Sequence, residues 1–214
     1  MEPSLYAADF ARLGEQIDEL LEAGVRVFHY DVGDGHFVEP ITIGPIVLES
    51  IAERIHVRGG VIDVHLMVDN PARHFPQVAR AGGDSVTFHV EVTDEPGALL
   101  ALAREHGLGA GVAFNPQTEV ARAVAAAEGA DLCLCMSIEP GYSGQQFMPE
   151  ALPRIRELRG LLPHDVLVQV DGGIGAGNVR EVRDAGAALL VAGSAVFAHG
   201  DLQASYRGLV QALR

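Results

Sequence analysis

Lysine is missing from this chain, in which all 15 basic residues other than histidine are arginines. A lysine amine is the group that Schiff-base enzymes, including aldolases built on parallel barrels, need for their covalent chemistry. The sequence therefore excludes lysine-dependent catalysis of this kind.

Cysteine is scarce, since Cys133 and Cys135 are the only two in 214 residues. One residue separates them, so they match neither a Cys-x-x-Cys redox pair nor a zinc knuckle. We expect both to be buried strand residues, and this cysteine usage implies no oxidising compartment.

Long apolar runs and basic clusters are also lacking. No run approaches the roughly 20 apolar residues of a membrane span, and residues 1–6 do not resemble a secretory signal. The formal net charge of −14 argues against nucleic acid and anionic membranes as partners, because both demand a dense basic surface. The sequence predicts a soluble, cytoplasmic protein. A phosphorylated small molecule stays open as a partner, because backbone amides can bind phosphate.

The chain alternates short β-branched runs with amphipathic stretches eight times. Repeated strand-then-helix units predict a parallel sheet covered by helices. Eight units in 214 residues, 48% of them hydrophobic, favour an α/β fold closed into a (β/α)8 TIM barrel, with one domain over residues 1–214. No Gly-x-Gly-x-x-Gly follows the first strand, which weakens a dinucleotide-binding interpretation.

The expected elements follow from this alternation. Strands are predicted at residues 4–7, 26–31, 61–67, 85–89, 109–113, 131–136, 166–171 and 188–192. Helices are predicted at residues 11–23, 45–54, 71–82, 96–106, 117–127, 149–161, 177–185 and 202–213.

Four side chains that can bind a metal stand at the ends of apolar runs, namely His29, Asp31, His65 and Asp171. Successive strand side chains point to opposite faces, so His29 and Asp31 project together, and a barrel would bring the three strand ends to one point. Each residue alone is more often structural. Together they form a mixed nitrogen and oxygen set that suits zinc, iron(II), manganese or cobalt rather than calcium.

Glycine-containing turns follow the last three predicted strands, at residues 140–145, 171–175 and 192–194. Glycine lets the backbone approach a ligand closely, and a helix that follows aims unpaired amides at negative charge. Barrels often bind phosphate after strands seven and eight, so this placement favours a phosphorylated substrate.

Blocks along nearly the whole chain resemble the signatures of the ribulose-phosphate 3-epimerase family, in family order and at plausible spacing. They are Pro3-Ser4-Leu5, His29-Tyr30-Asp31-Val32-Gly33-Asp34-Gly35-His36-Phe37-Val38, Asp63-Val64-His65-Leu66-Met67-Val68, Thr87-Phe88-His89, Asn115-Pro116, Met136-Ser137-Ile138-Glu139-Pro140-Gly141, Val170-Asp171-Gly172-Gly173 and Gly193-Ser194-Ala195.

The resemblance implies inversion of carbon 3 of D-ribulose 5-phosphate to give D-xylulose 5-phosphate. It implies one divalent ion, zinc or iron(II) before manganese or cobalt, with Asp31 and Asp171 as acid and base, and association into a homo-oligomer. The implied metal ligands are His29, Asp31, His65 and Asp171. The implied substrate contacts are Ser4, His65, Met67, Met136, Gly141, Tyr142, Ser143, Gly144, Gly172, Gly173, Gly193 and Ser194.

This chemistry is physically coherent. A proton next to a ketone is too weakly acidic to remove near neutral pH unless the resulting enediolate is stabilised, which a metal can do. Two carboxylates on opposite faces of that planar intermediate allow one to remove a proton and the other to return one. No redox or nucleotide cofactor is needed.

The chain also departs from the family pattern. Gly33 stands where the family usually has methionine, residues 38–41 replace the usual Val-Pro-Asn-Ile, and Gly141-Tyr142-Ser143-Gly144 replaces Gly-Phe-Gly-Gly. We hypothesise that Gly33 leaves room for a longer substrate. A 3-epimerase of a ketohexose phosphate, such as allulose 6-phosphate, is therefore the nearest alternative.

Two further alternatives carry less weight. A phosphosugar lyase or decarboxylase on a related barrel would have an Asp-x-Lys-x-x-Asp motif near Asp31, where the lysine is missing. A metal-binding scaffold without activity would be expected to lose one of the two carboxylates, yet both are present. We expect His36 and His89 to support the loop or the metal ligands rather than bind the metal themselves.

Overall fold

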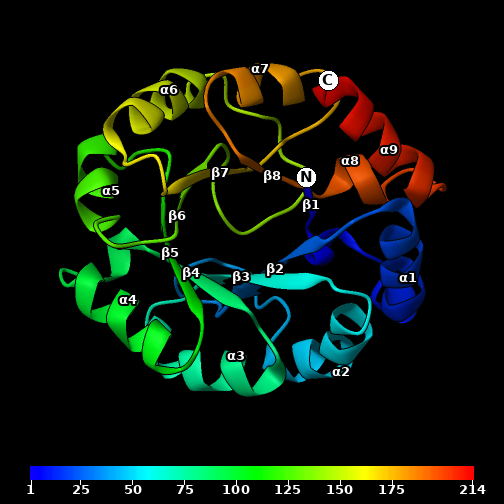
Figure 1. Cartoon of the computed structure of the whole chain (residues 1–214), viewed down its shortest axis with the longest axis horizontal. Coiled ribbons are helices and arrows are strands. Elements are labelled where there is room, and N and C mark those ends of the chain that lie inside the picture. The colour runs from blue at the N-terminus through cyan, green and yellow to red at the C-terminus, as the bar shows by residue number, and fades with distance from the viewer.

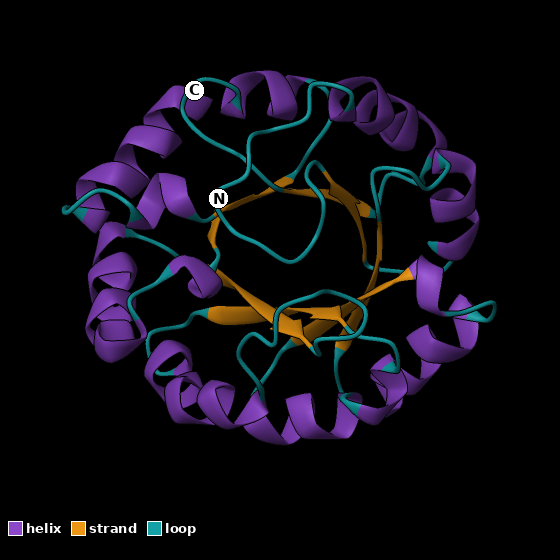
Figure 2. Cartoon of the chain, turned by 180° about the vertical axis from the view of Figure 1, so that it is seen from behind, coloured by secondary structure: helices purple, strands orange, loops and turns teal.

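The computed structural model describes all 214 residues as a barrel of parallel strands inside a ring of helices (Figure 1). The eight strands pair in the order β1-β8-β7-β6-β5-β4-β3-β2, and a single parallel bridge from Ser4 to His29 links the two ends of this sheet. The predicted (β/α)8 barrel is confirmed. Seen from behind, the helices again surround the sheet on every side (Figure 2).

The strands are β1 (Glu2–Pro3), β2 (Val27–Gly33), β3 (Val61–Met67), β4 (Ser85–His89), β5 (Gly109–Phe114), β6 (Leu132–Met136), β7 (Leu167–Asp171) and β8 (Leu189–Ala192). The helices are α1 (Leu13–Ala23), α2 (Pro45–His56), α3 (Phe75–Ala81), α4 (Pro96–Glu105), α5 (Val120–Ala126), α6 (Ala151–Leu161), α7 (Val179–Asp184), α8 (Ser194–Phe197) and α9 (Leu202–Leu213). None of them is both long enough and apolar enough to cross a membrane.

Two predicted elements were wrong in detail, and one element was missed. The first strand is Glu2–Pro3 rather than residues 4–7, because the chain turns into a 3-10 helix, Leu5–Ala7, in which the Ala7 amide donates to the Ser4 carbonyl at 3.1 Å. The helix predicted at residues 71–82 is split into a 3-10 turn and α3, since Pro76 has no N–H to continue a helix from the preceding turn. The short helix α8 was not predicted.

Apolar packing lies mainly between the sheet and the helices, where 56 buried residues form one cluster. Cys133 and Cys135 belong to it as free, buried thiols, as predicted, and burial raises the pKa of Cys135 to about 12. Leu132, Leu134 and Met136 alternate with them on β6 and belong instead to a cluster of five. Because alternate side chains on a strand face opposite ways, these three point into the barrel.

The barrel interior also holds a buried polar layer, formed by Glu2, His29, Asp63 and Gln169 from β1, β2, β3 and β7. The Gln169 amide nitrogen donates to Glu2 Oε2 at 2.5 Å and to Asp63 Oδ2 at 2.8 Å. The Ser85 hydroxyl donates to Asp63 Oδ1 at 2.6 Å. Asp63 and Gln169 lie two residues before His65 and Asp171, which face inward from the same strands, so this layer supports these two residues from below.

The ionised form of Glu2 is disfavoured in this layer. Burial, together with the negative charge of Asp63, raises the pKa of Glu2 to about 7. A carboxyl group whose pKa is raised on folding is harder to ionise in the folded protein than in the unfolded chain. At high pH, where the group is ionised in both states, it therefore destabilises the folded state. Stability associated with Glu2 is therefore lost as the pH rises from about 4.5 to about 7.

We predict that Glu2→Gln raises the free energy of unfolding at pH 8, in the presence of a chelator, by on the order of 2–3 kcal/mol over the original chain. The gain should vanish below pH 4.5, the ordinary value for this carboxyl, and urea titrations at pH 4 and pH 8 would measure it. The exposed Glu157→Gln serves as the matched control. An equal effect of Glu2→Gln at both pH values would contradict the assignment.

Candidate active site

The C-terminal ends of β2, β3 and β7 bring together His29, Asp31, His65 and Asp171, whose nearest ligand atoms all lie within 4.8 Å of one another. Parallel pairing accounts for this, because Asp31 is in register with His65, and Asp171 is in register with Met136. Paired residues of neighbouring strands share a face of the sheet. Residues as far apart in the sequence as His29 and Asp171 therefore meet, consistent with the strand alternation.

The distances within this cluster fit a single divalent ion. Asp31 Oδ1 lies 3.2 Å from His29 Nε2 and 3.2 Å from His65 Nδ1, and Asp171 Oδ2 lies 3.9 Å from His65 Nδ1. Ligand atoms bound at about 2.1 Å in a tetrahedral arrangement are separated by about 3.4 Å. In addition, His29 Nε2 is buried without a hydrogen-bond partner, and a bound cation would satisfy it. The four side chains could thus hold a divalent metal.

The two aspartates of the cluster have opposite electrostatic environments. Burial acts to raise the pKa of Asp31, but the imidazoles of His29 and His65, each 3.2 Å from Asp31 Oδ1, outweigh it and hold that pKa far below its usual range. Burial and the negative charge of Asp31 raise the pKa of Asp171 to about 7. When no cation is bound, one carboxylate is therefore ionised while its neighbour tends to hold a proton. Such a difference is typical of acid and base pairs.

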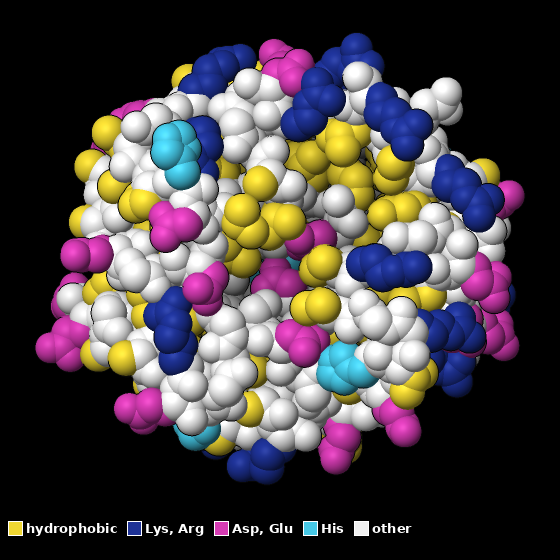
Figure 3. Space-filling view, in the orientation of Figure 1, with side chains coloured by type: hydrophobic (Ala, Val, Ile, Leu, Met, Phe, Trp, Pro, Cys, Tyr) yellow, Lys and Arg dark blue, Asp and Glu magenta, His cyan; other side chains and the backbone are white.

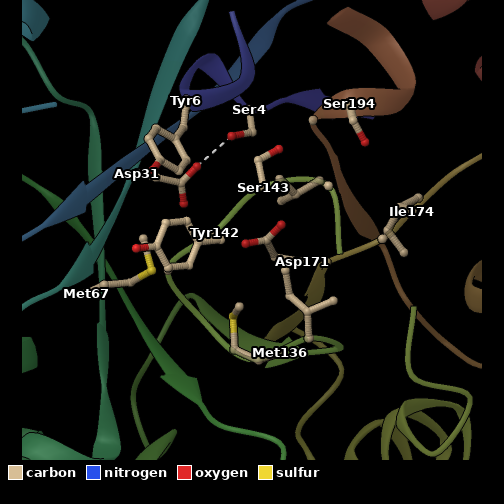
Figure 4. A pocket seen from close by; sticks show the side chains of 17 residues that line it. Ser4, Tyr6, Asp31, Met67, Met136, Tyr142, Ser143, Asp171, Ile174 and Ser194 are labelled. Atoms are coloured by element: carbon tan, nitrogen blue, oxygen red, sulfur yellow. Dashed lines mark hydrogen bonds between the residues drawn. The ribbon is translucent and has the colours of Figure 1, made fainter. Parts of the chain in front are cut away.

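Ser4 fixes the orientation of Asp31. Its hydroxyl donates to Asp31 Oδ2 at 2.6 Å (Figure 4). Asp31 Oδ1 is left to face the imidazoles of His29 and His65. Ser4 is buried because its backbone bridges to His29 at the closure of the barrel. The sequence predicted Ser4 as a substrate contact, and its hydroxyl also lines the pocket described next.

A pocket of about 520 Å³ opens beside the cluster, and Asp31 and Asp171 lie on two sides of it (Figure 4). A hollow with acidic side chains in it is seen near the middle of one face of the molecule (Figure 3). All three glycine-containing turns reach the pocket, and no arginine lines it. The predicted residues along its wall are Ser4, Asp31, Met67, Met136, Gly141, Tyr142, Ser143, Gly144, Asp171, Gly172, Gly173, Gly193 and Ser194.

The turn after β7 requires glycine. Gly172 and Gly173 have φ values of 123° and 65°, a region that other residues rarely adopt. A Cβ on Gly173 would lie 2.3 Å from the backbone nitrogen of Phe147. The turn therefore packs tightly against the segment after the Gly141–Gly144 loop, and the two surfaces form one wall of the pocket.

The idea that Gly33 leaves room in the pocket was wrong. A Cβ at Gly33 would meet Val38 Cγ2 at 2.8 Å, the Pro40 carbonyl oxygen at 3.0 Å and Thr42 Cγ2 at 3.1 Å. The Thr42 hydroxyl also accepts a hydrogen bond from the Gly33 amide at 2.6 Å. The loop after β2 thus fills the space that a larger side chain would occupy, and Gly33 does not line the pocket.

Several contributors were not singled out from the sequence. Tyr6 lines the pocket from the 3-10 turn that was predicted as a strand, Ile138 lines it from the segment just after β6, and Ile174 lines it from the glycine turn after β7. The support of His29 by Asp63, with the Nδ1 to Oδ2 distance at 3.3 Å, was also missed. Only the inward alternation of Asp63 with His65 could have indicated it.

The other two histidines near the site differ from each other. His89 is fully buried, its Nε2 lies 2.8 Å from His65 Nε2, and burial lowers its pKa to about 4. His36 is exposed, and it contacts Asp34 within the loop after β2. Neither belongs to the cluster that could hold the metal.

This chain resembles known proteins along nearly its whole length. The model of the Ribulose-phosphate 3 epimerase family matches residues 1–197. Ribulose-phosphate 3-epimerase of Escherichia coli strain K12 is 40% identical over 215 residues, which cover 99% of this chain and 93% of that protein. The protein of the same name from Bacillus subtilis strain 168 is 40% identical over 203 residues, covering 93% and 92%.

Solved structures show how widely the fold is shared. A 3-hexulose-6-phosphate synthase matches with a TM-score of 0.76 at 20% identity, covering 100% of both chains. The orotidine 5'-phosphate decarboxylase from Pyrococcus horikoshii OT3 matches with a TM-score of 0.70 at 15% identity, covering 100% of this chain and 99% of that one. At such identities the likeness concerns the barrel alone.

The sequence relatives identify the family of this chain, which the shared barrel fold cannot do. A family model covers most of the chain, and identity of 40% extends along nearly all of it. The chain belongs to the ribulose-phosphate 3-epimerase family.

Proposed function

We propose that this protein inverts carbon 3 of D-ribulose 5-phosphate to give D-xylulose 5-phosphate, with Asp31 and Asp171 as its two proton-transfer groups. The observation that carries this proposal is the placement of the two carboxyl groups on two sides of one pocket. An ionised carboxylate can take a proton from carbon 3 while a protonated one delivers a proton to the other face. Inversion then follows from geometry.

His29, Asp31, His65 and Asp171 would hold one divalent ion, through His29 Nε2, His65 Nδ1 and carboxylate oxygens. Such an ion acts as a Lewis acid that stabilises negative charge developing on the substrate oxygens. Zinc or iron(II) suits this ligand set best, with manganese or cobalt as alternatives, and metal analysis of the purified protein would decide. Met67 and Met136 are both nearly fully buried at the pocket wall and exclude water from the reacting carbon.

The phosphate group is assigned to the wall formed by the Gly141–Gly144 loop, Gly172, Gly173, Gly193 and Ser194. Because no arginine lines the pocket, backbone amides and hydroxyl groups would have to bind the phosphate. Ser143 is well placed for this, since its Oγ lies 3.1 Å from the position of a Cβ on Gly193 and so bridges two of the turns.

Cytoplasmic location and homo-oligomeric assembly remain proposals from the sequence and the family resemblance. Ile41 and Ile46 are 83% and 81% exposed near the start of α2, which is compatible with a contact between copies. Light scattering of the purified protein would measure the assembly state.

We predict that Asp31→Asn and Asp171→Asn each lower the rate of epimerisation by about 10²- to 10⁴-fold, because each removes one proton-transfer group. In heavy water, each variant that still binds metal should incorporate deuterium at carbon 3 of only one epimer, since the remaining carboxylate serves only one face. Mass spectrometry of the sugar phosphates would measure this.

The exposed Asp165→Asn is the matched control, and metal content is measured in every variant. Substantial inversion by either active-site variant would contradict the two-carboxylate assignment. Absence of deuterium at carbon 3 with the original protein would instead favour a barrel without activity.

We predict that replacing both Ser143 and Ser194 by alanine raises KM for ribulose 5-phosphate by about tenfold or more, because each hydroxyl would donate to a charged phosphate. The kcat value should change little. Turnover of unphosphorylated D-ribulose should be equal in the variant and the original protein, and Ser50→Ala provides an exposed control. A uniform loss on both substrates would argue against phosphate contact.

We predict that kcat/KM for ribulose 5-phosphate exceeds that for allulose 6-phosphate by about tenfold or more, because the extra carbon of the ketohexose finds no vacant space beside Gly33. Parallel assays of the two substrates with one preparation would measure the ratio. A preference for the hexose phosphate would establish the alternative activity in place of the one proposed.

A further inference from the structure

A chain of hydrogen-bonding groups leads from His65 away from the pocket. His65 Nε2 lies 2.8 Å from His89 Nε2, and His89 Nδ1 lies 3.2 Å from Glu91 Oε2. Glu91 Oε1 accepts a hydrogen bond from the backbone N–H of Asn115 at 2.8 Å and another from the Thr118 hydroxyl. The two imidazole rings meet edge to edge, with their planes inclined by 23° and their centroids 5.0 Å apart. We call His65, His89 and Glu91 the imidazole relay.

The far end of the relay fixes the position of one proton. An ionised carboxylate can only accept hydrogen bonds, so Glu91 requires a hydrogen on His89 Nδ1. The backbone N–H of Asn115 and the hydroxyl of Thr118 both donate hydrogen bonds to Glu91 Oε1, which keeps Oε2 directed at His89. The loop after β5 thus sets the orientation of the His89 ring.

The near end of the relay then has two arrangements. Two nitrogens 2.8 Å apart share one hydrogen, which belongs either to His65 Nε2 or to His89 Nε2. Only the first arrangement leaves a neutral His89, since its Nδ1 already carries a hydrogen. The His89 ring is fully buried, and burial disfavours the charged form. A hydrogen on His65 Nε2 leaves the lone pair of His65 on Nδ1, which faces Asp31 at 3.2 Å and Asp171 at 3.9 Å.

We propose that His89 and Glu91 are positioning residues that hold His65 with Nε2 protonated and with Nδ1 available as a metal ligand. This inference rests on the proposed function, because it takes His65 as one of the ligands. Neither positioning residue touches the substrate pocket. Their effect is on which nitrogen of His65 can bind and on the direction in which it points.

The second histidine of the cluster is supported differently. His29 Nδ1 lies 3.3 Å from Asp63 Oδ2, so a carboxylate acts on this ring without a second imidazole. His29 would therefore bind a metal through Nε2 and His65 through Nδ1, so the two rings face the cluster with different nitrogens. The relay is what makes the unlike orientation of His65 stable.

The decisive comparison is between His89→Leu and His89→Gln. Leucine removes the acceptor for His65 Nε2, whereas the glutamine oxygen can accept that hydrogen bond and its NH2 group can donate to Glu91. Chelator competition would measure the affinity for Zn²⁺, and the absorption spectrum of the Co²⁺-loaded protein would report the ligand geometry. Steady-state assays would give kcat and KM separately.

We expect His89→Leu to weaken Zn²⁺ binding by about 10- to 100-fold, to lower kcat and to alter the Co²⁺ spectrum, with KM for the sugar phosphate changed less than about threefold. His89→Gln should remain within about threefold of the original protein in Zn²⁺ affinity. Unchanged affinity in a folded His89→Leu protein, or equal losses in both variants, would overturn the relay.

A second pair of variants decides the question if His89→Leu fails to fold. Glu91 is partly exposed, so Glu91→Leu is better tolerated, and it should weaken Zn²⁺ binding more than Glu91→Gln, which keeps an acceptor for His89. Equal affinity in the two Glu91 variants would overturn the relay. A wild-type protein that binds no stoichiometric divalent ion would instead refute the proposed metal site, which separates the two failures.

Discussion

Crowding of carboxyl groups inside the barrel is the constraint on which the site depends. Glu2, Asp31 and Asp63 are buried in the barrel and Asp171 is only partly exposed, so their charges are poorly solvated. Their polar neighbours are imidazoles, the Gln169 amide and the hydroxyls of Ser4 and Ser85. Like charges this close cannot all remain ionised unless a proton or a cation compensates them. The same crowding therefore makes the cluster attractive to a divalent ion and makes Asp171 able to hold a proton.

The carboxylates repel one another, and a rigid sheet is needed to hold them close together. The parallel register of β2 with β3 fixes Asp31 beside His65, and that of β6 with β7 fixes Met136 beside Asp171. Loops add what the strands cannot, since the segment after β2 closes over Gly33 and the glycine turns shape the pocket wall. The strands thus determine the chemistry, while the loops determine which sugar phosphate can approach it.

Strand alternation and the order of the units were sufficient to predict the barrel and the convergence of His29, Asp31, His65 and Asp171, because both depend on local periodicity. The supporting contacts could not be predicted in this way. Gln169 stands in an apolar run and meets Asp63 across 106 positions, and only the closed barrel determines that contact. The filling of the space at Gly33 likewise depends on how a loop folds back, which no periodic pattern encodes.

The barrel alone does not specify the reaction, since a 3-hexulose-6-phosphate synthase and an orotidine 5'-phosphate decarboxylase share it at 20% and 15% identity. The residues at the strand ends carry that information. This chain has no lysine, and its site combines two carboxylates with two imidazoles. An imidazole is neutral when it binds a metal and carries a hydrogen on only one nitrogen. Each ring therefore needs a hydrogen-bond partner that fixes which nitrogen is free to bind. The polar layer below His29 and the relay behind His65 meet that requirement, and the buried network is therefore part of the site.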